Sequence, residues 1–310
     1  MRTPDRVRLG AVGYLNARPL VRGLDRMTRF EVRFDVPSRC AALLHDGDID
    51  VGLIPSIEYL RAPTDRLEAH REQAGRGSSG EYRIVPDLAI ASCGPVASVA
   101  LYTTRPIAEV RSIALDTSSR TSVALVRVLC ARLFGIEPSF EMCGPGIGAM
   151  LEQCDAALMI GDNALLLDHD HFRLESSAGH RAVTGGAATA SAIGGGAAAL
   201  TRIGKIDLGE AWTGMTGLPF VWAFWAGRAG ALTAADVRVL REARDAGIAC
   251  PEAVAREYFS TPAEQRLGAR YLRDNIKYHL GDAERAGVAL FYRYAAEIGL
   301  VEEAGELRFY

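Results

Sequence analysis

The sequence lacks an excess of charge of either sign. Its 310 residues include 35 lysines and arginines against 38 aspartates and glutamates, which leaves a net charge of −3. A surface that binds nucleic acid or an anionic membrane requires a clear excess of basic residues. We therefore expect neither nucleic acid nor a membrane among the partners of this protein.

Long hydrophobic runs and paired cysteines are also missing. No apolar run reaches the roughly 18 residues that a membrane-spanning helix needs. The first residues, MRTPDRVRLGAVGY, carry charges throughout and run into a strand pattern, unlike a secretory signal. The six cysteines form no C-x-x-C pair, and several lie in apolar runs where a thiol behaves as a small hydrophobe. We expect a cytoplasmic protein with reduced cysteines.

The usual cofactor motifs are absent from the sequence as well. It has no phosphate-binding G-x-x-x-x-G-K-[ST], no strand followed by G-x-G-x-x-G and no esterase G-x-S-x-G. His169 and His171 are close in sequence, but a zinc site needs a third protein ligand that this pattern does not supply. We expect no organic cofactor, no metal, and a small molecule as the partner.

What the chain does have is an alternation of strand and helix patterns. VRLGAVGY, FEVRFDV and IDVGLIP are typical of strands, with helices expected from near Ala17 and from Ser38 to about Asp46. A second series begins at RSIALD and continues with a helix from about Arg120 to Phe134. The pattern predicts an α/β protein with 49% hydrophobic residues available for its core.

Two lobes follow from the way these series connect. Extended segments are expected to cross between the lobes near Ser98 to Tyr102 and near Pro219 to Phe224. The polar segment 66–80 is expected to be an exposed loop, and the Ala/Gly-rich insertion 176–199 a mobile one. Ligands of such folds bind in the cleft outside the carboxyl ends of the strands. The predicted division is lobe 1, residues 1–101 and 218–310 with the C-terminal helices, and lobe 2, residues 102–217.

Hydroxyl side chains crowd the junction of a strand and a helix in IALDTSSRTSVALVRVLC. Five of the six residues from Thr117 to Ser122 carry a hydroxyl. Unpaired N–H groups and the helix dipole favour an anion at a helix start, and hydroxyls add donors without bulk. One hydroxyl, or Asp116, suffices as an N-cap, so capping leaves most of these residues unexplained. We therefore predict that this segment binds an anion.

Polar or small residues follow other strands in the same way. Asn16 follows the first strand, where it can equally serve as a helix N-cap. Trp222 and Trp225 have a core pattern, although one of them can stack on a ligand ring. The other candidates at strand ends facing the expected cleft are Ser56, Ser92, Gly94, Ser98, Gly161 and Asp162.

Six stretches between about Arg8 and Gly227 together form a specific pattern: RLGAVGYLNARPL, DIDVGLIPSIEY, YRIVPDLAIASCGPVASVALY, IALDTSSRTSVAL, DAALMIGDNAL and DLGEAWTGMTGLPFVWAFWAG. This pattern resembles the chorismate dehydratase family of the futalosine route to menaquinone. The resemblance implies a periplasmic-binding-protein-like fold of type II, with two lobes joined by crossing strands. It also implies a carbon–oxygen lyase that removes water from chorismate to give 3-[(1-carboxyvinyl)oxy]benzoate. The implied substrate contacts are Asn16, as the catalytic residue that orients the substrate, Ser92, Ser98, Ser119, Arg120, Thr121 and Ser122.

Other interpretations stay open. The related 1,4-dihydroxy-6-naphthoate synthase shares the implied fold, and a non-catalytic solute-binding protein or a cytosolic ligand sensor has the same cleft. LDTSSRTSVAL and TGLPFVWAFW favour the dehydratase over the synthase, and the absence of an export signal argues against a binding protein. No enzymic base is evident, because Asp116 and Asp162 are each explained as helix caps. We expect the enolpyruvyl carboxylate of chorismate to take the proton. The oligomeric state is not predicted.

Overall fold

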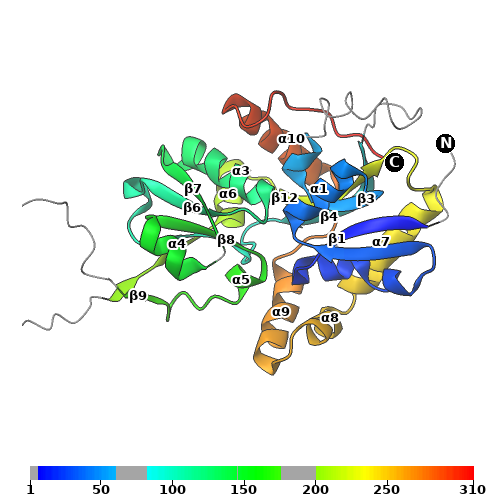
Figure 1. The fold of residues 1–310 in the computed structure, drawn as a ribbon, viewed down its shortest axis with the longest axis horizontal. Helices are drawn as coiled ribbons and strands as arrows, with labels where there is room; N and C mark the ends of the chain where they lie inside the picture. The colour runs from blue at the N-terminus through cyan, green and yellow to red at the C-terminus, as the bar shows by residue number, and fades with distance from the viewer. Residues whose placement is uncertain (1–5, 61–81, 145, 176–199) are drawn as a thin grey trace, which may run out of the picture.

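A computed structural model describes residues 6–60, 82–144, 146–175 and 200–310 of the chain. Two five-stranded sheets organise it into two lobes, each with helices on the faces of its sheet (Figure 1). The segments 66–80 and 176–199, which the sequence predicts to be loops, lie outside the described residues. Among the described helices, none combines the length and apolar character that crossing a bilayer requires.

The first sheet contains the strands from the start of the chain and one strand that returns from the other lobe. Strands β1, β2 and β3 are parallel, and the returning strand β12 runs antiparallel to both of its neighbours. Their carboxyl ends therefore meet at one edge of the sheet, with the amino end of β12 beside them. The order across the sheet is β2 (Phe30–Asp35), β1 (Val7–Val12), β3 (Val51–Pro55), β12 (Phe220–Arg228) and β4 (Tyr82–Ser92).

The second sheet repeats this arrangement with a different set of strands. Strands β6, β7 and β8 are parallel, while β5 runs antiparallel to β8 and β11 runs antiparallel to β5. A separate two-stranded sheet pairs β9 (Arg173–Glu175) with β10 (Leu200–Arg202). The order across the second sheet is β11 (Gly204–Asp207), β5 (Val99–Thr103), β8 (Ala156–Ile160), β6 (Ser112–Asp116) and β7 (Ser139–Cys143).

The chain crosses between the sheets twice, in short segments next to glycines. It leaves β4 after Ser92 and enters β5 at Val99, and Gly94 turns the crossing with a positive φ of 88°. It returns between α6 (Leu208–Thr216) and β12, where Gly217 has a φ of 72°. Both crossings precede the predicted positions by a few residues, because glycine permits the left-handed backbone that ends each element.

The predicted division into lobe 1 (residues 1–101 and 218–310) and lobe 2 (102–217) stays a prediction. The strand order supports it, apart from the first boundary, since β5 begins at Val99 and belongs to the second sheet. The helices after β12 pack mainly against β4, β12 and the segment Leu15–Val21 that follows β1. We propose that the first boundary lies before β5.

Helix ends follow local sequence signals. Helix α1 (Pro37–Asp46) begins at a proline in the first turn and ends at Gly47 in the left-handed conformation. The predicted helix near Ala17 is instead a 3-10 helix, η1 (Leu15–Val21), which contains Pro19. Proline lacks the N–H that an α-helix needs in its interior, and this accounts for the difference. The predicted helix from Arg120 to Phe134 is confirmed as α3 (Arg120–Leu129), which continues into a π-helical turn over Cys130–Phe134.

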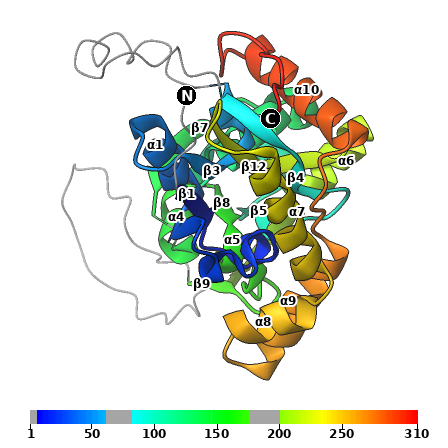
Figure 2. The ribbon, with the colours of Figure 1, turned by 90° about the vertical axis from the view of Figure 1, so that its right-hand side faces the viewer.

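The C-terminal helices cover the first sheet on two sides. Figure 2 shows α7 (Ala234–Ile248) along the sheet, with α8 (Pro251–Tyr258) and α9 (Pro262–Asp274) below it and α10 (Asp282–Glu297) above. Thr233 and Thr261 cap α7 and α9 through reciprocal capping boxes. Helix α10 packs against β12, whose first eight residues are all buried.

We predict opposite effects of one substitution at two helix glycines. In Gly247→Ala the new Cβ comes within 2.3 Å of the Pro19 carbonyl oxygen, so the backbone of η1 has to move. Overpacking of this kind costs about 1 to 3 kcal/mol of unfolding free energy. Gly214→Ala in α6 meets nothing within 4 Å and gains up to about 1 kcal/mol of helix propensity. Urea unfolding of both variants tests this, and equal stabilities contradict the close packing of α7 on η1.

Candidate active site

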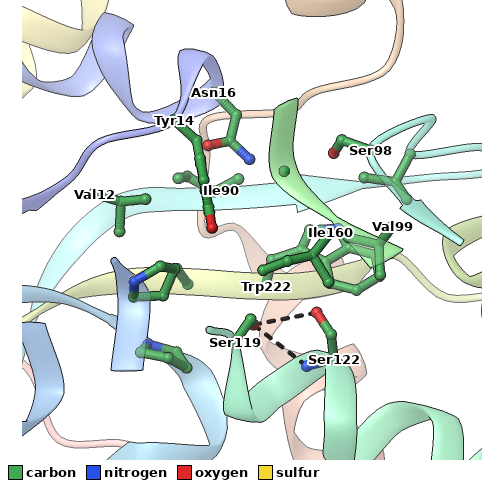
Figure 3. A pocket seen from close by; sticks show the side chains of 15 residues that line it. Val12, Tyr14, Asn16, Ile90, Ser98, Val99, Ser119, Ser122, Ile160 and Trp222 are labelled. Carbon is green, nitrogen blue, oxygen red and sulfur yellow. Dashed lines mark hydrogen bonds between the residues drawn. The ribbon is translucent and has the colours of Figure 1, made fainter. Parts of the chain in front are cut away.

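A cavity lies between the lobes where strand ends of both sheets meet (Figure 3). Its empty volume is about 460 Å³, including the part open to solvent. Small-molecule sites typically have mostly apolar walls with a few polar groups. The larger apolar side chains of this wall are Val12, Ile90, Val96, Val99, Ile160 and Trp222.

The hydroxyl-rich start of α3 forms one side of the cavity. Ser119 is the N-cap of the helix, and its Oγ accepts hydrogen bonds from the Ser122 N–H at 3.5 Å and the Ser122 hydroxyl at 3.1 Å (Figure 3). Both side chains line the cavity and are buried. Capping therefore accounts for Ser119, while the first N–H groups of α3 have no acceptor within the helix. An anion in the cavity would meet these groups.

Asn16 faces α3 from the other lobe and is held by a buried tyrosine. The Tyr278 hydroxyl donates to the Asn16 main-chain carbonyl oxygen at 2.9 Å, and the Tyr271 hydroxyl, on α9, lies 2.7 Å from Ser98 Oγ. Burial raises the pKa of Tyr271, so its hydroxyl stays neutral. Asn16 Oδ1 is buried and has no hydrogen-bond partner in the described part of the chain. Because a buried acceptor without a partner is costly, this oxygen is suited to a ligand donor.

Tyr14 enters the cavity beside Asn16 and touches the opposite lobe. Its hydroxyl lies 3.2 Å from Ser118 Oγ, and Ser118 Oγ donates to Asp116 Oδ1 at 2.6 Å. Gly161 lies against the Tyr14 ring, and a Cβ at this glycine would approach the ring carbons to 2.9 Å. Gly161 also has a positive φ of 63°, so glycine is needed here for two separate reasons.

Two predicted contacts near the first crossing lie outside the cavity lining. Ser92 is buried behind Trp222, whose indole N–H donates to Ser92 Oγ at 3.1 Å. Ser92 thereby orients the ring that lines the cavity. The Gly94 N–H donates to Thr213 Oγ1 at 2.9 Å and serves the turn. Trp225 is fully buried in the core.

Asp162 also lies outside the lining and connects the two lobes. Its Oδ1 accepts from the Leu15 N–H at 3.2 Å, and its Oδ2 accepts from the Tyr258 hydroxyl. Leu15 and Tyr258 belong to the first lobe and Asp162 to the second. Burial raises the pKa of the Asp162 carboxyl, and burial together with this carboxylate raises the pKa of Tyr258.

The remaining predicted residues form a second connection between the lobes. Thr121 Oγ1 accepts from the Ile57 N–H at 3.2 Å and lies 3.4 Å from Ser56 Oγ. Arg120 pairs with the buried Glu58 at 2.7 Å. These side chains hold the start of α3 against η3 (Ser56–Tyr59), outside the cavity lining.

The lining of the cavity contains neither a cation nor a metal-ligand set among the described residues. No lysine, arginine or histidine is part of it. Across the described ranges, no three His, Cys, Asp or Glu side chains come close enough to hold a metal ion. His171 pairs with the exposed Asp168, and His169 lies beside the Tyr102 ring. Recognition in the cavity therefore depends on hydroxyl, amide and main-chain groups.

Sequence reasoning missed three tyrosines of the site. Tyr14 lies within RLGAVGYLNARPL, two residues before Asn16. Its position just after the first strand is the signal that could have identified it. Tyr258 and Tyr271 lie on C-terminal helices where a buried tyrosine has the same pattern as a core residue. No local signal distinguishes them.

Comparison with known proteins gives both a family and a fold. The family described as menaquinone biosynthesis matches residues 7–70, 77–178 and 193–297. A protein of Thermus thermophilus named chorismate dehydratase is 31% identical over 287 residues, which cover 91% of this chain and 93% of that protein.

Solved structures with little sequence identity share the fold. A protein of Archaeoglobus fulgidus has a TM-score of 0.63 at 13% identity, covering 97% of this chain and all of that one. The periplasmic aliphatic sulphonate binding protein of Escherichia coli has a TM-score of 0.61 at 14% identity, covering 99% of this chain and 92% of that one. The expected periplasmic-binding-protein-like fold with two α/β lobes is confirmed.

We predict that Asp162→Asn keeps the lobes connected and Asp162→Ala does not. An asparagine side chain can still accept from the Leu15 N–H and can donate to the Tyr258 hydroxyl oxygen. The Tyr258 hydroxyl can then donate its own proton to the Gly13 carbonyl oxygen, 3.0 Å away. Alanine leaves the Leu15 N–H unpaired and removes the bond to Tyr258 across the lobes, which costs about 1 to 3 kcal/mol. Thermal melting measures the difference, and equal melting temperatures for the two variants contradict it.

The pH dependence of the Asp162 variants supplies a second measurement. The folded state binds the Asp162 proton more tightly than the unfolded state, because its pKa is raised from the ordinary 3.8. Wild-type stability therefore falls as the pH rises from about 4 through the raised pKa. Asp162→Asn should lack this contribution, and an unchanged pH profile contradicts the assignment.

Proposed function

The chain belongs to the menaquinone-biosynthesis family, and from this premise we propose that it is a chorismate dehydratase. The reaction removes water from chorismate and gives 3-[(1-carboxyvinyl)oxy]benzoate. The substrate is a small dianion with one ring hydroxyl and two carboxylates. The protein would act in the cytoplasm, in keeping with six free cysteines among its described residues.

One observation carries this proposal beyond the family resemblance. The hydroxyl-rich start of α3, with Ser119 and Ser122, faces Asn16 across an apolar cavity. A carboxylate of chorismate fits the helix start, where N–H groups and hydroxyls favour an anion. The ring hydroxyl fits Asn16 Oδ1, the buried acceptor that has no partner in the described part of the chain. Ser98, whose hydroxyl lies 2.7 Å from that of Tyr271, also lines the cavity and would contribute a further polar contact.

The chemistry requires stabilisation of negative charge near the ring carboxylate. The hydrogen on the ether-bearing ring carbon is vinylogous to that carboxylate, so its removal delocalises charge onto the carboxylate oxygens. Loss of the neighbouring hydroxide then makes the ring aromatic. Donors aimed at the carboxylate in an apolar site stabilise the developing charge more than they would in water.

The substrate itself would supply the base. No carboxylate or histidine is among the described lining residues of the cavity. The enolpyruvyl carboxylate is tethered to the carbon that loses its proton, and tethering gives a high effective concentration. Asn16 would act by orienting the substrate for this transfer.

The proposal is tested by incubating purified protein with chorismate and following the loss of 18 mass units. We expect conversion to the carboxyvinyloxy benzoate. Binding of chorismate without turnover would instead favour a solute-binding protein or a sensor. Turnover of the synthase substrate, with chorismate untouched, would favour 1,4-dihydroxy-6-naphthoate synthase.

We predict that Ser119→Ala raises the Michaelis constant for chorismate by about tenfold, which is about 1.4 kcal/mol. The reason is the loss of a hydroxyl at the proposed carboxylate position. The same change also removes the N-cap of α3, which costs about 1 kcal/mol of stability. Thr233→Ala is the matched control, because Thr233 is the N-cap of α7 and lies outside the cavity lining. Thr233→Ala should lose similar stability and keep its Michaelis constant. If the Michaelis constant rises equally in both variants, Ser119 acts only as a helix cap.

A further inference from the structure

The proposed dehydration leaves one chemical role without a residue. The substrate carboxylate accounts for removal of the proton, but the departing hydroxide needs a proton from a donor nearby. Among the described residues that line the cavity, Tyr14 is the one with a titratable side chain. The hydroxyls of Ser98, Ser119 and Ser122 share the cavity but are much weaker acids.

The position of Tyr14 suits a donor. The residue lies between the end of β1 and the start of η1, and its side chain extends across the cavity toward the start of α3 (Figure 3). Its ring is held against Gly161 on the opposite lobe, where no Cβ fits. The hydroxyl is therefore delivered to the cavity when the two lobes are in contact. Burial raises the pKa of Tyr14, which keeps the proton on the hydroxyl at neutral pH.

The neighbours of the Tyr14 hydroxyl can stabilise its ionised form for a short time. Ser118 Oγ lies 3.2 Å away and carries a proton that it donates to Asp116 at 2.6 Å. When Tyr14 is ionised, the Ser118 hydroxyl can turn its proton toward the phenolate, while the Ser118 N–H still bonds to Asp116 at 3.0 Å. Burial and the charges of Asp116 and Asp162 raise the pKa of Tyr14, whereas this bond lowers it.

We propose that Tyr14 is the general acid of the dehydration, an inference that rests on the proposed function. The enolpyruvyl carboxylate takes the ring proton, and the carbon–oxygen bond to the hydroxyl breaks with its electron pair on oxygen. The Tyr14 hydroxyl gives its proton to that oxygen, which leaves as water. The phenolate then regains a proton from the enolpyruvyl carboxylic acid, so Tyr14 is again neutral and the enolpyruvyl group is again a carboxylate. No oxidant, reductant or further reactant is consumed.

The first test compares Tyr14→Phe with wild-type protein on chorismate. We expect kcat to fall by about a hundredfold to ten-thousandfold, the usual contribution of a general acid, with the dissociation constant for chorismate changed less than about threefold. Tyr292→Phe is the control, because Tyr292 is even more deeply buried than Tyr14 and its hydroxyl donates to the Ser56 carbonyl, outside the cavity. Tyr292→Phe should lose at least as much stability as Tyr14→Phe and keep kcat. A Tyr14→Phe variant with wild-type kcat, or with a loss confined to binding, overturns the assignment.

A substrate with a different leaving group separates acid catalysis from a structural role. In the chorismate analogue with fluorine in place of the ring hydroxyl, fluoride leaves without needing a proton. Tyr14→Phe should then act within about tenfold of wild type on this analogue. An equal loss on chorismate and on the analogue would mean that Tyr14 only shapes the cavity. If wild-type protein converts neither compound, the proposed function fails, and that outcome is distinct from a defect confined to the variant.

Discussion

The direction of the strands is the constraint on which the site depends. In each sheet the parallel strands end at the edge that faces the other lobe, and the two short crossings keep those edges together. A polar residue that follows a buried strand must emerge at this edge. Asn16, Ser98 and Ser119 come from distant parts of the sequence and still reach one cavity. The site is therefore a consequence of the fold, and its chemistry changes with the residue that follows each strand.

The strand-end residues that do not line the cavity join its two walls. Asp162 binds the Leu15 N–H and Thr121 binds the Ile57 N–H, each from the opposite lobe. A hydrogen bond of this kind contributes about 0.5 to 1.5 kcal/mol, so a few of them hold the lobes together without preventing their separation. A ligand that contacts both lobes adds to the same balance and shifts it toward contact. Tyr14 and Ser118 meet in that state, so lobe contact also completes the cavity.

Sequence reasoning predicted the architecture better than it predicted individual contacts. The alternation of patterns indicated both series, and strand ends indicated Asn16, Ser98, Ser119, Ser122 and Gly161, which all line the cavity. Ser56 and Thr121 have the same local signal, but their hydroxyls lie against each other, and each also bonds to main chain, Ser56 to the Val221 carbonyl of its own lobe and Thr121 to the Ile57 N–H of the opposite lobe. That difference depends on how closely two lobes approach, and no local pattern reports it. Tyr271 was missed because a helix tyrosine that supports a site resembles one that fills a core.

No cation is present among the described lining residues, and this affects how strongly the site binds the substrate relative to the transition state. An arginine beside each carboxylate would hold a dianion as strongly before the reaction as during it, and such uniform binding does not accelerate the chemical step. Hydroxyls and helix N–H groups are weaker donors, and in the proposed binding mode their effect grows as charge moves onto the substrate carboxylate. Apolar walls such as Ile90 and Trp222 exclude the water that would screen this growing charge. A few neutral donors in a dry cavity therefore favour the charge distribution of the transition state over that of the bound substrate.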